Sequence, residues 1–463
     1  MDTIIKNGTL VTLGGLYRAD LGITGEKISH IALDLPTEGK QVVDARERFV
    51  LPGAIDAHTH MEWPGSADDF ETGTRAAAHG GVTTIVDFAV QYRGKTLQET
   101  IMDWRSRADP KVVIDYGLHI VVSSFNADTA GELKTLAADG ITSFKMWMTS
   151  SHSGGLGVDD AVIYQVMDVA AQVGALVGLH CENDPAMRLL IQNFLKAGKT
   201  GPLYHRLSRP PFVEAEAIRR VATLAEATSC NLYIPHMSSG AGRVALNEAQ
   251  ARGVRVVAET CPQFLSLTDE VYTRADAAHF VMSPPIKMQQ DQDELWAGLA
   301  AGDIVSVGSD HCPYSDEMKQ KGKDDFSIIP NGVPGTEAIV PIVYGLGVAR
   351  KRLTLPQMVA VTAENPARLF GMYPRKGVLR VGSDADIIIL DPQGITALDA
   401  KSMHSGIEYS VYNDFVLPGR VVATIARGEC IVRDDEFTSN SGRGKFLARS
   451  NPDPAIWKRA RNV

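Results

Sequence analysis

The sequence lacks any long apolar run. No stretch of its 463 residues approaches the ~20 consecutive apolar residues that a membrane span needs. The first eight residues do not contain the basic segment followed by an apolar segment that marks a signal peptide. We also find no short-period repeat and no low-complexity tract. The sequence therefore predicts a folded cytoplasmic protein with no membrane partner.

The sequence also has few cysteines and no net positive charge. The five cysteines are scattered and lie mostly inside apolar runs, which is typical of reduced thiols in the cytoplasm. Acidic residues outnumber basic ones, 55 to 46, and the net charge of -9 argues against nucleic acid or an anionic membrane as a partner. Hydrophobic residues make up 44% and charged residues 22% of the chain, which is ordinary for a globular protein. The length suits one barrel with an accessory domain.

From about residue 50, short apolar runs alternate with helical stretches. Near-continuous apolar and β-branched runs are typical of buried parallel strands. Eight such strands are predicted: Gly53–His58, Val82–Phe88, Tyr116–Val122, Ile141–Met148, Leu176–Cys181, Leu232–Met237, Val254–Cys261 and Ile304–Asp310. The predicted helices between them include Asp68–His79, Asp128–Ala138, Asp159–Val173, Glu214–Thr228 and Ala241–Arg252. Eight β/α units predict a (β/α)8 TIM barrel over residues 51–375.

Both ends of the chain are rich in short strands and turns. Residues 1–50 contain strand-like runs separated by Asn-Gly, Gly-Gly and Gly-Glu signals. Residues 376–440 contain similar runs at Gly377–Leu379, Ala385–Leu390 and Arg420–Gly428, after a predicted helix over Leu355–Phe370. We expect the two ends to pair into one small β-sandwich beside the barrel, which makes the fold class α/β. Residues 441–463 are basic and polar and are predicted to form a tail that packs on a neighbouring subunit.

Metal-ligand side chains stand at the ends of several predicted strands. The pattern starts with two histidines in the segment Asp56–His60, which share one face if the segment is a strand. The complete set is His58, His60, Lys145, His180, His236 and Asp310. Each residue alone has an ordinary structural explanation, such as a hydrogen-bonded core histidine or a helix cap. Because the carboxyl ends of barrel strands meet at one rim, the six together predict a metal centre there.

These residues and three further motifs resemble the amidohydrolase superfamily, and within it the dihydropyrimidinases and hydantoinases. The motifs are Met282–Pro285, Gly308–Pro313 and Pro330–Gly335. The resemblance implies a hydrolase that opens the ring of a cyclic amide: a dihydropyrimidine, a 5-substituted hydantoin or a related cyclic imide. It also implies two zinc ions per subunit, with a bridging hydroxide as the nucleophile, and a homotetramer or homodimer.

The resemblance gives each rim residue a role. His58, His60 and Asp310 would bind the more buried zinc ion, and His180 and His236 the second. Lys145, carboxylated on its amine, would bridge the two ions as an anion. Asp310 would in addition be catalytic, because its carboxylate could accept the proton of the hydroxide and pass it to the leaving nitrogen.

The substrate-binding residues match the family less completely. Ser283 and Asn331 match a serine and an asparagine that hold the edge of the cyclic substrate. The family carries an oxyanion-binding tyrosine five residues after the bridging lysine, and this position is Ser150 here. We expect a wider pocket at Ser150 that favours bulky rings, with His152 either a replacement donor or an exposed loop residue. The segment Glu62–Pro64 is expected to face the substrate.

Three alternatives share the fold. An allantoinase-type ureide hydrolase fits, because it lacks the same tyrosine. A dihydroorotase is disfavoured, since Glu62 stands where those enzymes carry an arginine for the substrate carboxylate. A non-catalytic scaffold protein is also disfavoured, because this chain keeps all six ligand positions.

Overall fold

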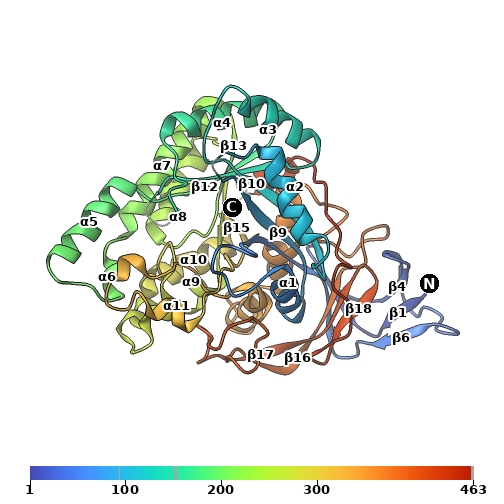
Figure 1. The fold of residues 1–463 in the computed structure, drawn as a ribbon. Helices are drawn as coiled ribbons and strands as arrows, with labels where there is room; N and C mark the ends of the chain where they lie inside the picture. The colour runs from blue at the N-terminus through green and yellow to red at the C-terminus, as the bar shows by residue number, and fades with distance from the viewer. Residues whose placement is uncertain (93, 151–153, 460–463) are drawn as a thin grey trace.

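The computed structural model describes residues 1–92, 94–150 and 154–459. At its centre lies a sheet of eight parallel strands in chain order, surrounded by helices (Figure 1). A parallel bridge between Thr59 and His311 connects the chain after the last strand to the first, and so closes the sheet. The predicted (β/α)8 barrel is therefore confirmed. Its strands are β8 (Ala54–Thr59), β9 (Val82–Val90), β10 (Asp115–Val121), β11 (Ser143–Trp147), β12 (Leu176–His180), β13 (Asn231–Ile234), β14 (Val256–Thr260) and β15 (Ile304–Val307).

Amphipathic helices cover the outside of the barrel. Side chains fix where several of them begin: Asp69 accepts hydrogen bonds from two backbone amides of the first turn of α1, and Thr96 forms a capping box with Glu99 in α2. In the described part of the chain, no helix is both long and apolar enough to cross a membrane. The long helices are α1 (Phe70–His79), α2 (Leu97–Ala108), α3 (Thr129–Ala138), α4 (Asp160–Val173), α5 (Asp184–Lys196), α7 (Pro211–Thr228), α8 (Gly240–Ala251) and α10 (Gln289–Ala301).

The predicted helix Leu355–Phe370 is helical throughout most of its length but not uniformly α-helical. A π-helical turn, Ala360–Glu364, separates α13 (Leu355–Val359) from α14 (Asn365–Leu369). Pro366 has no N–H to donate one turn back, which accounts for the wider turn before it. The remaining short helices are α6 (Leu203–Leu207), α9 (Pro262–Ser266), α11 (Asp316–Gln320), α12 (Ile339–Ile342) and α15 (Ala455–Arg459).

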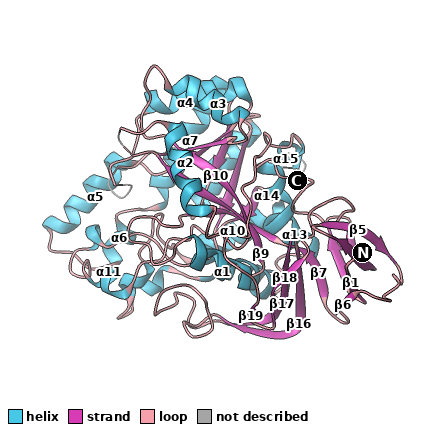
Figure 2. Ribbon diagram, turned by 45° about the vertical axis from the view of Figure 1, so that its right-hand side comes forward, coloured by secondary structure: helices cyan, strands magenta, loops and turns pink. Residues whose placement is uncertain are grey.

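The two chain ends form two sheets beside the barrel (Figure 2). One has the order β5-β4-β1-β6, and the other the order β19-β18-β17-β16-β7-β2-β3. The antiparallel pair of β7 and β16 joins the N-terminal and C-terminal parts, with Leu51 opposite Ile388. Side chains from both ends fill the core, which confirms the predicted sandwich; among them are Ile5, Leu21, Val50, Ile387 and Ile425. The strands are β1 (Thr3–Lys6), β2 (Thr9–Thr12), β3 (Gly15–Arg18), β4 (Asp20–Thr24), β5 (Lys27–Ala32), β6 (Gln41–Asp44), β7 (Phe49–Pro52), β16 (Ile387–Ala397), β17 (Val416–Ala426), β18 (Glu429–Arg433) and β19 (Glu436–Phe437).

One predicted strand of the C-terminal block is wrong. The segment Gly377–Leu379 is irregular, and Gly377 has a left-handed φ of 79°. A Cβ on Gly377 would lie 2.6 Å from the carbonyl oxygen of Ala363, so glycine is required there by both conformation and space. The domain bounds expected from the sequence remain a prediction.

The C-terminal segment lies against its own barrel rather than projecting from it. The N–H of Tyr116 donates to the Lys445 carbonyl, and Arg449 donates to the Leu118 carbonyl and to the Ser143 hydroxyl at 2.5 and 2.8 Å. Arg449 is only 4% exposed, which indicates a packed segment. These contacts lie along the early parts of β10 and β11, away from the rim where the ligand residues are expected.

Candidate metal and substrate site

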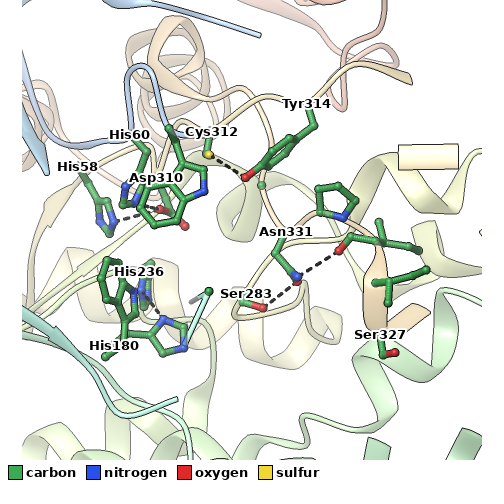
Figure 3. Close-up of a pocket in the computed structure, with 17 residues that line it drawn as sticks. His58, His60, His180, His236, Ser283, Asp310, Cys312, Tyr314, Ser327 and Asn331 are labelled. Carbon is green, nitrogen blue, oxygen red and sulfur yellow. Dashed lines mark hydrogen bonds and ion pairs between the residues drawn. The ribbon is translucent and has the colours of Figure 1, made fainter. Parts of the chain in front are cut away.

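A cavity of about 330 Å³ opens at the C-terminal ends of the barrel strands (Figure 3). Figure 3 shows the predicted histidines and Asp310 gathered at one end, with the two predicted substrate residues opposite them. Aromatic and aliphatic side chains complete the wall, so the cavity combines a polar end with an apolar lining. The lining residues include His58, His60, His180, His236, Asp310, Ser283, Asn331, Trp63, Trp147, Cys312 and Tyr314.

One group of ligand atoms comes from the end of β8 and from the loop after β15. His58 Nε2 and His60 Nε2 lie 3.0 and 3.1 Å from the same oxygen, Asp310 Oδ1. Burial disfavours a charged imidazole, but Asp310 and Glu259 outweigh it and raise the pKa of His58 to about 9. The same buried carboxylates that favour a positive charge on His58 make this donor set suitable for a metal cation.

A second group comes from the ends of β12 and β13. His180 Nδ1 lies 3.0 Å from His236 Nε2, and both residues are buried. Burial is the main cause that lowers the pKa of each ring, so both are neutral imidazoles at neutral pH. Two neutral rings whose nitrogens face each other are suited to sharing one metal ion.

Lys145 lies on β11 near both groups, and its charge contributes to lowering the pKa of His60, His180 and His236. It is 1% exposed, and its Nζ has no hydrogen-bond partner among the residues that the structure describes. Its Nζ lies 5.4 Å from the centroid of the Phe88 ring. Burial lowers the pKa of Lys145 to about 8. An unpaired buried ammonium is costly, so the position fits an uncharged or chemically modified amine.

Two buried glutamates orient the histidines, and the sequence reasoning missed both roles. Glu259 Oε1 lies 2.7 Å from His58 Nδ1, and Glu182 Oε2 lies 2.8 Å from His180 Nε2. Arg209 Nη1 donates to the same Glu182 oxygen at 2.8 Å. A carboxylate on the far nitrogen fixes the tautomer and orientation of a metal-binding imidazole. The signal that could have found Glu259 is an acidic residue in the otherwise apolar strand β14.

The backbone around the ligands is locally strained. His236 and Asp310 have φ values of 40° and 53°, in the left-handed region that glycine favours. Ser309 helps to hold the turn at Asp310, because its N–H and hydroxyl donate to Asp56 at 3.0 and 2.5 Å. Gly308 leaves space for Glu259, since a Cβ there would lie 2.2 Å from Glu259 Oε2.

The predicted substrate residues differ in their position relative to the cavity. Ser283 and Asn331 line the cavity together, and the Ser283 hydroxyl donates to Asn331 Oδ1 at 2.9 Å. Ser150 is exposed and is not among the lining residues of the described chain; its N–H donates to Asp184 Oδ1 at 3.3 Å. His152 lies outside the described residues.

The loop after β8 divides its side chains between two environments. Trp63 lines the cavity and lies edge-on to His60, with 5.5 Å between ring centroids. Glu62 instead makes ion pairs with Lys111 and Arg107. Trp63 therefore faces the cavity and Glu62 faces its ion-pair partners, while contact of this loop with the substrate remains a prediction.

The chain belongs to the amidohydrolase family, because residues 49–431 match the Amidohydrolase family. It is 43% identical to a D-hydantoinase of Ralstonia pickettii over 97% of this chain and 99% of that protein. It is 39% identical to a D-phenylhydantoinase of Escherichia coli over 98% of this chain and 100% of that one. The crystal structure of dihydropyrimidinase from Brevibacillus agri matches with a TM-score of 0.95 at 38% identity, covering 98% of this chain and 99% of that chain. The family predicted from the sequence is thus confirmed.

Proposed function

We propose that this protein is a metal-dependent cyclic amidohydrolase. Its reaction is hydrolysis of a ring C–N bond in a dihydropyrimidine, a 5-substituted hydantoin or a related cyclic imide. The observation that carries the proposal is the convergence of two ligand groups on one cavity that also holds Ser283 and Asn331. The relatives with similar sequences are named as hydantoinases and phenylhydantoinases, enzymes of this class.

The proposed cofactor is a pair of zinc ions. His58, His60 and Asp310 would hold one ion, His180 and His236 the other, and Lys145 carboxylated on Nζ would bridge them. Imidazole and carboxylate ligands suit zinc, and the unpartnered Nζ of Lys145 fits a modified amine. Bound there, the ions would lower the pKa of a water molecule towards neutrality and polarise a substrate carbonyl.

The residues of the chain perform the remaining steps. Asp310 accepts a proton from the attacking water and returns it to the leaving ring nitrogen, as a general base and then a general acid. Ser283 and Asn331 hold the polar edge of the ring. Trp63 and Trp147, whose ring centroids lie 6.1 Å apart, form an apolar wall that excludes bulk water.

A substrate screen combined with metal analysis tests the proposal. Purified protein should contain up to two zinc ions per chain, and removal of the metal with a chelator should abolish ring opening. The substrates to compare are dihydrouracil, dihydrothymine, hydantoin, phenylhydantoin, allantoin, succinimide and phthalimide. Full activity of metal-free protein would contradict the metal assignment, and exclusive activity on allantoin would favour the allantoinase alternative.

We further propose that the protein is a cytoplasmic homotetramer or homodimer. All five cysteines are free, as a reduced environment requires. Light scattering of the purified protein measures the number of subunits, and cell fractionation measures the location.

A further inference from the structure

The cavity contains a phenol that the sequence reasoning did not consider. Tyr314 lies on the loop between Asp310 and α11 and is 5% exposed. Among the described residues that line the cavity, it is the single tyrosine. In Figure 3 its hydroxyl points towards Cys312, on the same side of the cavity as Asp310.

The hydrogen bonds of Tyr314 leave its proton available. A phenol hydroxyl offers one donor and two acceptor positions. Cys312 Sγ lies 3.6 Å from Tyr314 Oη and donates to it. The O–H has no acceptor among the described residues apart from that thiol sulfur, which is a weak one. A carbonyl oxygen in the cavity would be a better partner.

The ring of Tyr314 is held in place by neighbours that also shape the substrate edge. The hydroxyl of Tyr409 donates to the Tyr314 carbonyl at 2.9 Å. Lys319 Nζ lies 5.7 Å from the Tyr314 ring centroid and donates to the carbonyls of Val281 and Pro330 at 2.7 and 2.8 Å. Those two carbonyls belong to the segments that carry the predicted substrate serine and asparagine. The phenol therefore has a fixed position relative to that edge.

Tyr314 also stays protonated under working conditions. Burial is the main cause that raises its pKa above the ordinary value for tyrosine, with Cys312 adding to the effect. A phenol that remains neutral can donate to a developing negative charge without first losing its proton.

We propose that the Tyr314 hydroxyl donates a hydrogen bond to the reacting carbonyl oxygen of the cyclic substrate. The inference rests on the proposed function. Water oxygen bonds to the carbonyl carbon while its proton passes to Asp310, and the carbonyl oxygen takes up the negative charge that Tyr314 stabilises. The C–N bond then breaks, the C=O bond re-forms, and the ring nitrogen takes a proton from Asp310. Tyr314 thus supplies the phenol that position 150 does not, from a different loop.

The variant Tyr314→Phe removes the hydroxyl and keeps the ring. A donor that acts mainly in the transition state affects kcat more than KM, and loss of one such donor typically costs ~10²–10³-fold in kcat. We expect that fall with KM nearly unchanged, and with wild-type metal content and thermal stability. The control is Tyr164→Phe, an exposed tyrosine on α4, which should leave all four quantities unchanged.

A binding measurement separates this inference from the proposed function. Succinimide binding should perturb the near-ultraviolet tyrosine spectrum of the wild type and of Tyr164→Phe, but not that of Tyr314→Phe. A kcat for Tyr314→Phe within a few-fold of wild type would overturn the role of Tyr314 while leaving the proposed function intact. If the wild type opens no ring, the proposed function fails. In that case the spectra still test the contact between Tyr314 and the ligand, because identical succinimide difference spectra for wild type and Tyr314→Phe would overturn it. Should Tyr314→Phe fail to fold, fluorotyrosine labelling of the wild type replaces it, and the absence of any resonance shift with succinimide would reject the contact.

Discussion

Two buried lysines, one at the rim of the barrel and one at its junction with the sandwich, have very different surroundings. Lys145 at the rim is 1% exposed and Lys376 at the junction is 2% exposed. Lys376 Nζ lies 2.7, 3.0 and 2.5 Å from carboxylate oxygens of Asp115, Asp384 and Asp386. Lys145 Nζ has no hydrogen-bond partner in the described part of the chain.

The electrostatic consequence follows from these neighbours. Burial disfavours both ammonium groups, and at Lys145 it lowers the pKa to about 8. At Lys376 the three carboxylates outweigh burial and raise the pKa above its ordinary value. The junction is complete as folded, since each charge has a partner, and so serves stability. At the rim, the Lys145 amine has no hydrogen-bond partner among the described residues, which supports the proposed carboxylation of its Nζ.

The largest expected effect comes from Lys145→Met, which replaces the amine by an apolar chain of similar length. We expect loss of bound metal and a fall in activity of ~10³-fold or more, because metal catalysis supplies several kcal/mol. Stability of the metal-free protein should not fall, since no paired charge is lost. Lys145→Arg should also be inactive, because a guanidinium stays charged and cannot be carboxylated. Metal analysis, kinetics and urea unfolding measure these outcomes, and an active Lys145→Arg enzyme would contradict the bridging role.

The matched variant Lys376→Met should lower the stability of the protein and leave its metal content and activity unchanged. Removing the cation breaks the ion pairs of Lys376 with three buried carboxylates, of which Asp115 keeps Arg427 and Asp384 keeps Lys27 and Arg375. Breaking a buried ion pair typically costs ~3–5 kcal/mol. Urea unfolding should show this loss, while metal content and kcat of the folded enzyme stay at wild-type values. If stability were unchanged and activity were lost, the division between junction and rim would be incorrect.

The dependence of stability on pH tests the same contrast between the junction and the rim. Despite burial, Lys376 and Lys27 hold the pKa of Asp384 down to about 2, from an ordinary value of 3.8. A carboxyl whose pKa is lowered by folding stabilises the fold above its unfolded pKa and loses that contribution as pH falls through the folded value. Wild-type stability should therefore decline between about pH 4 and pH 2, and Lys376→Met should decline less steeply there. Parallel slopes for the two proteins would remove Lys376 as the cause.

Asp310→Asn tests proton transfer at the rim without removing all of the bound metal. The amide keeps the size and one oxygen of the carboxylate but cannot carry a proton from the attacking water to the leaving nitrogen. We expect kcat to fall by at least ~100-fold, with part of the metal retained. A kcat within a few-fold of wild type, measured on metal-loaded protein, would remove Asp310 from the proton-transfer role.

The smallest effect is expected from Ser150→Tyr. Ser150 is exposed and does not line the cavity, whereas Tyr314 does. The added phenol should change kcat on dihydrouracil and on phenylhydantoin by no more than a few-fold. Removing one oxyanion donor typically costs ~10²–10³-fold, so a gain of that size would show that position 150 supplies the donor after all.

The barrel and the gathering of candidate ligand side chains at one rim were predictable for a definite physical reason. Buried parallel strands are apolar along their whole length, so a polar residue at a strand end is conspicuous, and the carboxyl ends of all eight strands meet at one rim. From the sequence alone, that reasoning placed His58, His180 and Asp310 at one rim of the barrel. It missed Glu182 and Glu259, because a carboxylate behind a histidine has no fixed spacing from it in the sequence.

Local patterns along the chain thus determined the succession of strands and helices, the pairing of the two ends and the set of ligand side chains. Tertiary structure decided which side chains complete the site. Position 150 lies shortly after the strand of Lys145, yet Ser150 is exposed and is not among the described residues that line the cavity, whereas Tyr314 comes from a loop after the last barrel strand and does line it. Sequence spacing fixes direction only within a strand or helix; beyond its end, the packing of loops decides which side chain meets the substrate.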